Sequence, residues 1–271
     1  MITERLKVAI KCFRSRRENL NHQETEREIK NELKIWKLLK KNVNIVPLLG
    51  LIRGQGRQLD PESSIPPWPV SEWYEDGELN NFLKSRKDLD DLTRLALLID
   101  VARGLAHIHW LDIVHGDLKG SNVIVGNQGK IAKICDFGSA RIDCGCGEPL
   151  EDPLGTAQWD SPELQNDAPR SSSSDIWAFG CVALETQFNR TPYVLNDMRT
   201  YQMQRKGLPP ATSESIDFEV SVISRGIWSI MQECWEREPT KRPKTPNVLA
   251  ELDVLKVKVG AGTVLRLIVW Y

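Results

Sequence analysis

The spacing of apolar residues along the chain changes near residue 77. Before that point, short apolar runs rich in β-branched residues predict strands, and one longer stretch with apolar residues at helical spacing predicts an amphipathic helix. The strands are expected at residues 6–12, 45–53 and 68–73, and the helix at residues 24–40, with Ile29, Leu33, Trp36 and Leu39 on one stripe. Residues 54–67 are rich in Gly, Pro and Ser and predict a loop.

Beyond residue 77 the spacing is mainly helical. Helices are expected around residues 92–108, 175–186, 223–236 and 246–255, with two short strands at 122–125 and 130–135. A small strand-rich part before a larger helical part predicts an α+β fold with two lobes, an N-lobe at residues 1–72 and a C-lobe at residues 77–256. Residues 257–271 match no expected element and stay unassigned, and their β-branched residues favour an extended end.

Composition narrows the class of protein. The 271 residues are 41% hydrophobic and 27% charged, which is typical of a globular chain, and the formal net charge of −1 gives no reason to expect nucleic acid as a partner. No apolar run is long enough for membrane insertion, and no secretory signal precedes the first strand. Six cysteines without such a signal indicate reduced thiols and a cytoplasmic, intracellular location. The pattern does not indicate an oligomeric state.

Four short motifs follow one another along the chain: Val8-Ala9-Ile10-Lys11, His115-Gly116-Asp117-Leu118-Lys119-Gly120-Ser121-Asn122, Asp136-Phe137-Gly138 and Ser161-Pro162-Glu163. In this order they resemble the strand lysine, the catalytic loop, the metal-binding motif and the A-P-E motif of protein kinases. Each motif alone is weak evidence. All four in order, each in its expected strand or loop context, are far too specific to be a chance match.

The resemblance covers nearly the whole chain and implies a bilobal protein-kinase domain over residues 1–256. Residues 230–235 are similar to a signature shared by tyrosine kinases and the tyrosine-kinase-like group. Lys119, two residues after Asp117, resembles the residue that serine/threonine members of the family have at this position. The resemblance therefore implies a transferase, a protein serine/threonine kinase that moves the γ-phosphoryl group of ATP to a serine or threonine hydroxyl of a protein substrate.

The resemblance also assigns a role to each motif in phosphoryl transfer, which depends on positioning and on concentrated positive charge. Asp117 is expected to orient the acceptor hydroxyl and take its proton. Lys119 is expected to neutralise the transferring phosphate, and Lys11 to contact the α/β-phosphates of ATP. Asn122 and Asp136 offer the hard oxygen ligands that Mg²⁺ prefers, so ATP and Mg²⁺ are the implied cofactors.

Lys11 needs a carboxylate that holds it in place. Glu32 is the expected partner, because it lies four residues before Trp36 on the predicted amphipathic helix, in the phrasing of the kinase C-helix. Glu28, one turn earlier on the same face, is the alternative.

The nucleotide base is expected to bind where the lobes join. By resemblance, Ser71 is a small gatekeeper residue that leaves room behind the adenine. Backbone groups of Glu72 to Tyr74 are expected to form hydrogen bonds with the adenine, while Ala9 and Ile124 enclose it from two sides.

Other positions are expected to support this site. Trp36, Leu48, Phe137 and His115 resemble the stacked apolar column that links the lobes of active kinases, based on Asp175. Thr156, after Gly155, resembles the residue that borders a hydroxyl substrate in serine/threonine enzymes, and Arg242 is expected to form a structural ion pair with Glu163.

Two departures from the family pattern leave a second interpretation open. Gly116 stands where many kinases have arginine, so the catalytic loop offers no guanidinium to an activation-loop phosphate. Only ten residues precede Lys11, which is too few for the G-x-G-x-x-G loop and its flanking strands, so these N-terminal strands are expected to be missing and ATP binding to be weak. The alternative is a catalytically weak or inert pseudokinase that serves as an interaction module.

Overall fold

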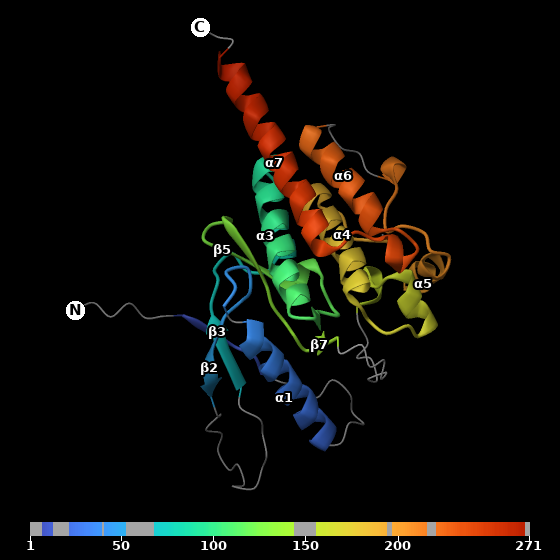
Figure 1. Ribbon diagram of the computed structural model, residues 1–271. Helices are drawn as coiled ribbons and strands as arrows, with labels where there is room; N and C mark the ends of the chain where they lie inside the picture. Colours follow the sequence, from blue (N-terminus) through green and yellow to red (C-terminus); the bar gives the residue numbers. More distant parts are fainter. Residues whose placement is uncertain are drawn as a thin grey trace, which may run out of the picture.

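The computed structural model describes residues 7–12, 22–39, 41–52, 68–143, 156–193, 197–215 and 221–268. The predicted loop at residues 54–67 and Gly155 lie outside these ranges. Two lobes are evident in Figure 1, a small one with a sheet and one helix, and a larger one built mainly from helices. The expected α+β bilobal architecture is confirmed.

The small lobe contains an antiparallel sheet with the strand order β1-β3-β2, formed by β1 (Val8–Ile10), β2 (Leu48–Ile52) and β3 (Trp68–Glu72). Helix α1 (His22–Leu39) lies beside this sheet. Its buried stripe includes Ile29, Glu32, Trp36 and Leu39 at helical spacing, whereas Leu33, which the sequence places on this stripe, is only partly buried. A buried carboxylate needs a hydrogen-bond donor or a cation beside it, so the position of Glu32 on this stripe indicates an ion pair or hydrogen bond there.

The large lobe is built around two buried helices. These are α3 (Asp91–Trp110), which begins with Asp90 accepting a hydrogen bond from the Thr93 backbone, and α4 (Ser172–Phe188), which begins with a reciprocal capping box between Ser171 and Ser174. Helix α4 is buried on nearly every side, so it provides a fixed base for the loops around it. The large lobe also contains the helices and strands α2 (Leu79–Ser85), β4 (Ile113–Val114), β5 (Val123–Gly126), β6 (Ile131–Ile134), β7 (Arg141–Ile142), α5 (Asp197–Arg205) and α6 (Val222–Cys234).

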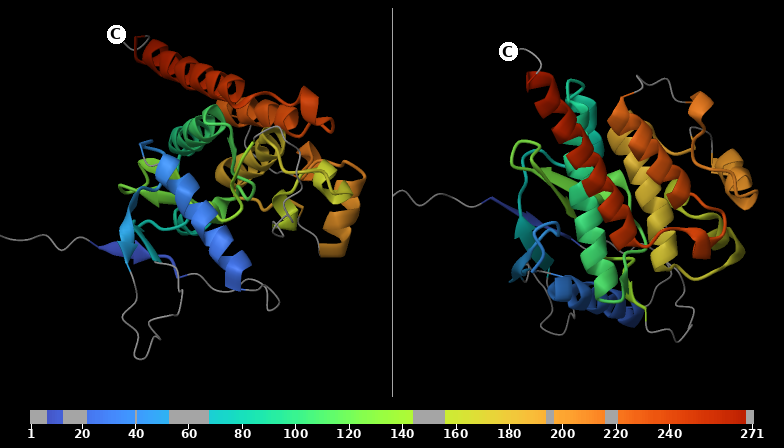
Figure 2. Two further views of the ribbon diagram at one scale, coloured as in Figure 1. Left: turned by 60° about the horizontal axis from the view of Figure 1, so that its bottom comes forward. Right: turned by 45° about the horizontal axis from the view of Figure 1, so that its top comes forward.

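The C-terminal helix corrects one expectation. Helix α7 (Thr245–Ile268) packs on α3 and α6 and continues well past residue 255, so most of the tail that the sequence left unassigned, with an extended end, is helical. Figure 2 shows α7 running along α3 and ending beyond it. Packing of its first turns against the lobe overrides the β-branched composition of the later residues, because helical stability comes mainly from tertiary contacts.

Backbone hydrogen bonds join the lobes directly. Ile134 of β6 donates to the Asn44 carbonyl at 2.8 Å and accepts from the Val46 amide at 2.9 Å. The Trp36 indole of α1 donates to the Val46 carbonyl at 2.7 Å. Helix α1 is therefore positioned against the segment that carries the third motif.

The expected ion pair between Arg242 and Glu163 is confirmed. Both guanidinium terminal nitrogens reach the carboxylate at 2.7 Å, and the Arg242 side chain is fully buried.

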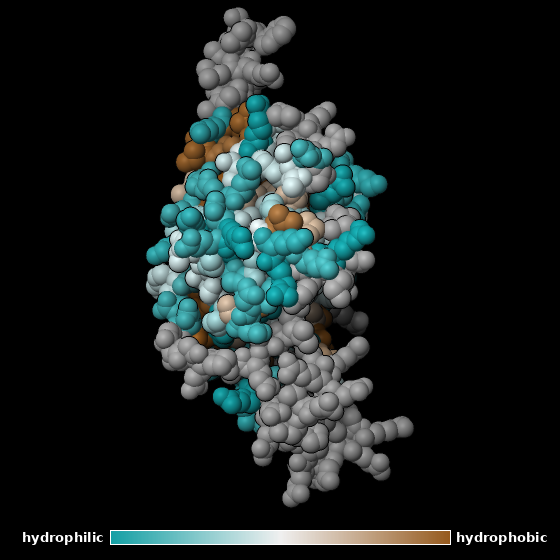
Figure 3. Space-filling view, turned by 90° about the vertical axis from the view of Figure 1, so that its right-hand side faces the viewer, coloured by the Kyte–Doolittle hydropathy of each residue, from teal (hydrophilic) through white to brown (hydrophobic). Residues whose placement is uncertain are grey.

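The face shown in Figure 3 is mostly hydrophilic, with hydrophobic residues in small groups. Within the described part of the chain, no helix combines the length and the apolar character that crossing a bilayer requires.

Glu185 is a polar node inside the large lobe. From α4 it accepts hydrogen bonds from Asn80 Nδ2 of α2 (3.0 Å), the Gly120 backbone amide (3.0 Å) and Trp159 Nε1 (3.1 Å). Burial raises the pKa of Glu185 to about 7, although these three donors and Lys119 act in the opposite direction. The folded chain therefore holds this proton more tightly than the unfolded chain does.

We predict that Glu185 makes the protein less stable as the pH rises from 5 to 7. A carboxyl pKa raised from 4.5 to about 7 means that the native state binds more protons than the unfolded state in this window. The free energy of unfolding, measured by urea denaturation, should fall by about 2 kcal/mol more in wild type than in Glu185→Gln over this range. Parallel pH profiles for the two proteins would contradict the prediction.

Candidate active site

The first motif meets the third across the junction of the lobes. Lys11, directly after β1, places Nζ 2.5 Å from Glu32 Oε1 of α1 and 2.6 Å from Asp136 Oδ1 in the loop after β6. Burial alone lowers the pKa of Lys11, but the charges and hydrogen bonds of the two carboxylates outweigh it and raise the pKa above its usual value. Lys11 is therefore a cation held between Glu32 and Asp136.

The choice between the two candidate carboxylates of α1 is settled by burial. Glu32 lies on the buried stripe with 5% of its side chain exposed and contacts Lys11, whereas Glu28 is exposed. The expected Lys11–Glu32 pair is confirmed. Glu28 and Glu32 are one helical turn apart, so the position of α1 along the sheet decides which of them reaches Lys11.

The catalytic-loop residues converge on the Asp117 carboxylate. Lys119 Nζ lies 2.7 Å from Asp117 Oδ2, and Asn122 Nδ2 donates to the Asp117 carbonyl (2.7 Å) and to Oδ2 (3.1 Å). The single turn of 3₁₀ helix at Gly120–Asn122 brings these side chains together. The loop thus presents a carboxylate, a cation and an amide oxygen within a few ångströms.

Residues 156–161, here called the platform segment, touch this cluster through Thr156. Its hydroxyl lies 2.6 Å from Lys119 Nζ and 3.2 Å from Asp117 Oδ1. Farther along the segment, Trp159 donates to Glu185 at 3.1 Å, which ties the segment to α4. Thr156, which by resemblance is expected to border a hydroxyl substrate, therefore lies beside Asp117 and Lys119.

Asp175 of α4 fixes the backbone of the catalytic loop. Its carboxylate accepts from the His115 amide at 2.7 Å and the Gly116 amide at 2.9 Å, and a hydrogen bond of 2.9 Å joins it to His109 Nε2. Burial raises the pKa of Asp175, but the hydrogen bond and the charge of His109, with the other donors, lower it below its ordinary value. The loop is therefore held by a buried anion.

Aromatic rings connect this anchor with α1. The ring centroids of His115 and Phe137 lie 5.6 Å apart in an edge-to-face arrangement, and those of Phe137 and Trp36 lie 6.1 Å apart. Leu48 is partly buried and packs against the same core. The expected column therefore exists from Trp36 to His115, on Asp175, and His115 has a packing role.

The residues expected to contact the adenine lie on the small-lobe sheet, on the segment after β3 and on β5. Ala9 pairs with Ser71 in the sheet, and Ile124 forms an isolated bridge with Glu78 at the end of the hinge. Glu72 ends β3 and accepts a hydrogen bond of 2.5 Å from the Tyr74 hydroxyl. Burial, with this contact, raises the pKa of Tyr74, so its hydroxyl stays a donor. Ser71 is buried.

The oxygen donors suit a magnesium-bound nucleotide. Because Asn122 Nδ2 donates to Asp117, the amide oxygen of Asn122 is oriented away from the Asp117 side chain. The Asp136 carboxylate is held by Lys11 and by the Gly138 amide at 3.2 Å. Mg²⁺ in such sites takes one or two protein oxygens, with substrate phosphates and waters completing its octahedron, so the residues fit.

Three residues that brace the site are not evident from the motifs: Trp159, Glu185 and Gln204. Gln204 of α5 donates to the Asp160 carbonyl at 3.0 Å and also to the Ala157 carbonyl. Glu185 could have been noticed as a carboxylate in an apolar helix. Trp159 and Gln204 carry no such sequence signal, because their contacts depend on how distant elements pack.

Comparison with known proteins agrees with this geometry. The family model of the protein kinase domain matches residues 2–252. Serine/threonine-protein kinase CTR1 of Arabidopsis thaliana is 29% identical over 239 residues, which cover 84% of this chain and 26% of that protein. Tyrosine-protein kinase Fer of Rattus norvegicus is 31% identical over 249 residues, which cover 86% of this chain and 28% of that protein.

The chain spans about a quarter of the length of these two relatives. The two relatives are named for different acceptor residues, so the likeness alone leaves the choice between serine/threonine and tyrosine open. The family model, in contrast, covers most of the chain, including all four motifs. The first three motifs meet in space, since Lys11 contacts Asp136 and the His115 ring packs on Phe137, and the chain belongs to the protein kinase family.

Proposed function

We propose that the chain transfers the γ-phosphoryl group of Mg²⁺-bound ATP to a serine or threonine hydroxyl of a protein substrate. The observation that carries the proposal is the cluster of Asp117, Lys119 and Thr156, in which all three side chains lie within hydrogen-bonding distance of one another. Membership in the protein kinase family supports transfer to proteins in general.

The choice of a serine or threonine acceptor rests on Lys119 and Thr156. Both side chains crowd the Asp117 carboxylate, so an acceptor that bonds to it has to approach closely. The hydroxyl oxygen of serine or threonine is one bond from Cβ, which suits such a close approach. The tyrosine hydroxyl is separated from Cβ by an aromatic ring. Lys119 Nζ is placed to neutralise the charge that develops on the transferring group.

The nucleotide would bind between the lobes. The Glu72 to Tyr74 backbone would hold the adenine between Ala9 and Ile124, and Lys11 would contact the phosphates. Asn122 and Asp136 would hold Mg²⁺, which supplies a concentrated positive charge at the phosphate oxygens. Asp117 would accept the proton of the acceptor hydroxyl. It is the one carboxylate in the catalytic loop, residues 115–122, and it lies beside Thr156.

An inert interaction module is the alternative, and the geometry favours the enzyme. A scaffold has no need for Lys11 to be paired with both Glu32 and Asp136, or for Asn122 to be oriented by Asp117. Holding several charges together under partial burial costs free energy, and an arrangement of this kind is the signature of a functional site.

We predict that Asp117→Asn and Asp136→Ala each remove nearly all transfer activity. Loss of a positioned base typically lowers the rate by about 10²–10⁴-fold. The measurement is transfer of label from γ-labelled ATP to dephosphorylated casein, with circular dichroism to check that the fold persists. The control is Asp88→Asn, which removes an exposed carboxylate that pairs with Arg86. Equal rates for wild type and Asp117→Asn would contradict the assignment.

A second prediction follows from Gly116. Because position 116 has no guanidinium to bind a phosphate, transfer should not depend on phosphorylation of residues 139–156, of which 144–155 lie outside the described residues. Phosphatase treatment should leave the rate unchanged within about twofold, with mass spectrometry to confirm that the segment is bare. A rate that falls in step with phosphate loss at Ser139 or Thr156 would contradict this prediction.

A further inference from the structure

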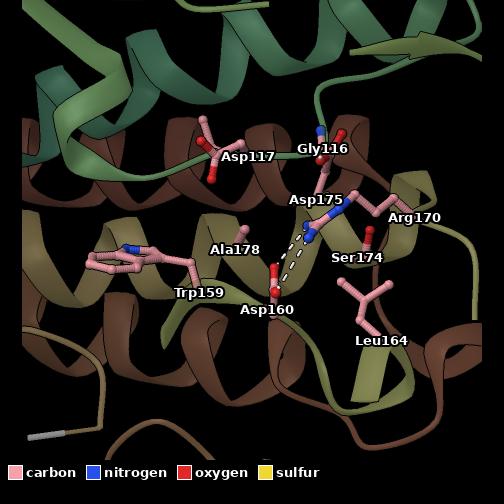
Figure 4. Close-up of a pocket in the computed structure, with 10 residues that line it drawn as sticks. Gly116, Asp117, Trp159, Asp160, Leu164, Arg170, Ser174, Asp175 and Ala178 are labelled. Carbon is pink, nitrogen blue, oxygen red and sulfur yellow. Dashed lines mark hydrogen bonds and ion pairs between the residues drawn. The ribbon is translucent and has the colours of Figure 1, made fainter. Parts of the chain in front are cut away.

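A buried ion pair lies next to the catalytic loop. Arg170, two residues before α4 begins, reaches both carboxylate oxygens of Asp160, through Nη1 at 2.8 Å and Nη2 at 3.3 Å. The two side chains are 8% and 14% exposed. Figure 4 shows the pair in a pocket that Gly116 and Asp117 also line.

The stem of Arg170 packs where the catalytic loop carries no side chain. Gly116 has a φ of +77°, a conformation that favours glycine. A Cβ at this position would lie 2.5 Å from the Ser139 carbonyl oxygen and 3.3 Å from Arg170 Cδ. The aliphatic part of Arg170 is thus in contact with the loop, while its guanidinium points to Asp160.

Asp160 belongs to the platform segment. At the near end of that segment, the Thr156 hydroxyl meets Asp117. At the far end, Arg170 binds the Asp160 side chain and Gln204 donates to the Asp160 carbonyl. The pair therefore couples the backbone of the catalytic loop, through the stem of Arg170, to the segment that borders the acceptor.

The form of the interaction suits this role. Burying two charges is costly even when they are paired, so such a pair contributes less to stability than to fixing one arrangement. A guanidinium that binds both oxygens of a carboxylate also sets the orientation of its partner, which a lysine cannot do.

We propose that Arg170 is a positioning residue that fixes the platform segment through Asp160, so that the segment is held against the catalytic loop without a guanidinium at position 116. The inference rests on the proposed transfer reaction and deepens it. It explains how the segment can be ordered without an activation-loop phosphate. Arg170 does not touch the reacting groups; it acts through Asp160 and the segment.

The test is Arg170→Met, which keeps an unbranched stem and removes the guanidinium. We expect the KM for dephosphorylated casein to rise by about tenfold or more, equivalent to about 1.4 kcal/mol, while the calorimetric affinity for Mg²⁺–ATP stays unchanged. In Asp160→Leu/Arg170→Met, the buried charge is gone and thermal stability should recover, but the KM should stay high. Two outcomes would overturn the proposal. One is a KM that returns to the wild-type value together with stability in the double variant. The other is a loss of ATP affinity in Arg170→Met as large as the rise in the KM for casein.

Hydrogen exchange keeps this test separate from the proposed function. Arg170→Met should exchange faster than wild type at residues 156–161, whereas the control Arg103→Met, which removes an exposed guanidinium on α3, should not. If wild type transfers no label to casein, the proposed function fails, and exchange still decides the role of Arg170. Unchanged exchange at residues 156–161 in Arg170→Met would overturn the inference.

Discussion

The buried carboxylate of Asp175 is the constraint on which the site depends. It lies on a helix that is enclosed on nearly every side, and a charge there is tolerable only if donors surround it. Those donors are the backbone amides of His115 and Gly116, with the ring of His109. The need to satisfy one buried anion therefore determines the path of the catalytic loop.

Aromatic contacts connect the Asp175-bound loop with the small lobe. The His115 ring packs on Phe137 and Phe137 on Trp36, so the third motif and α1 take their places from the same loop. Helix α1 in that position brings Glu32 to Lys11, and Lys11 reaches Asp136. Lys11 is thereby held between two carboxylates at the junction of the lobes, where the proposed function would place the phosphates of ATP.

The sequence predicted much of this arrangement because the motifs are local and carry their chemistry with them. The bilobal class, the Lys11–Glu32 pair, the column from Trp36 to His115 and the Arg242–Glu163 pair are all confirmed. What the sequence did not reveal depends on distant packing. Helices α2 and α5 are short and weakly patterned, and the tail is helical because α7 continues from a packed start. The Arg170–Asp160 pair joins residues with no periodic relation.

The most direct test of the central claim is the identity of the residue that receives the phosphate. The purified chain is given γ-labelled ATP, Mg²⁺ and an equal mixture of peptides that differ only in a serine, threonine or tyrosine acceptor, and the labelled amino acid is identified after hydrolysis. Lys119 and Thr156 beside Asp117 predict label in phosphoserine and phosphothreonine. Label confined to phosphotyrosine, or no label with any acceptor, would contradict the account.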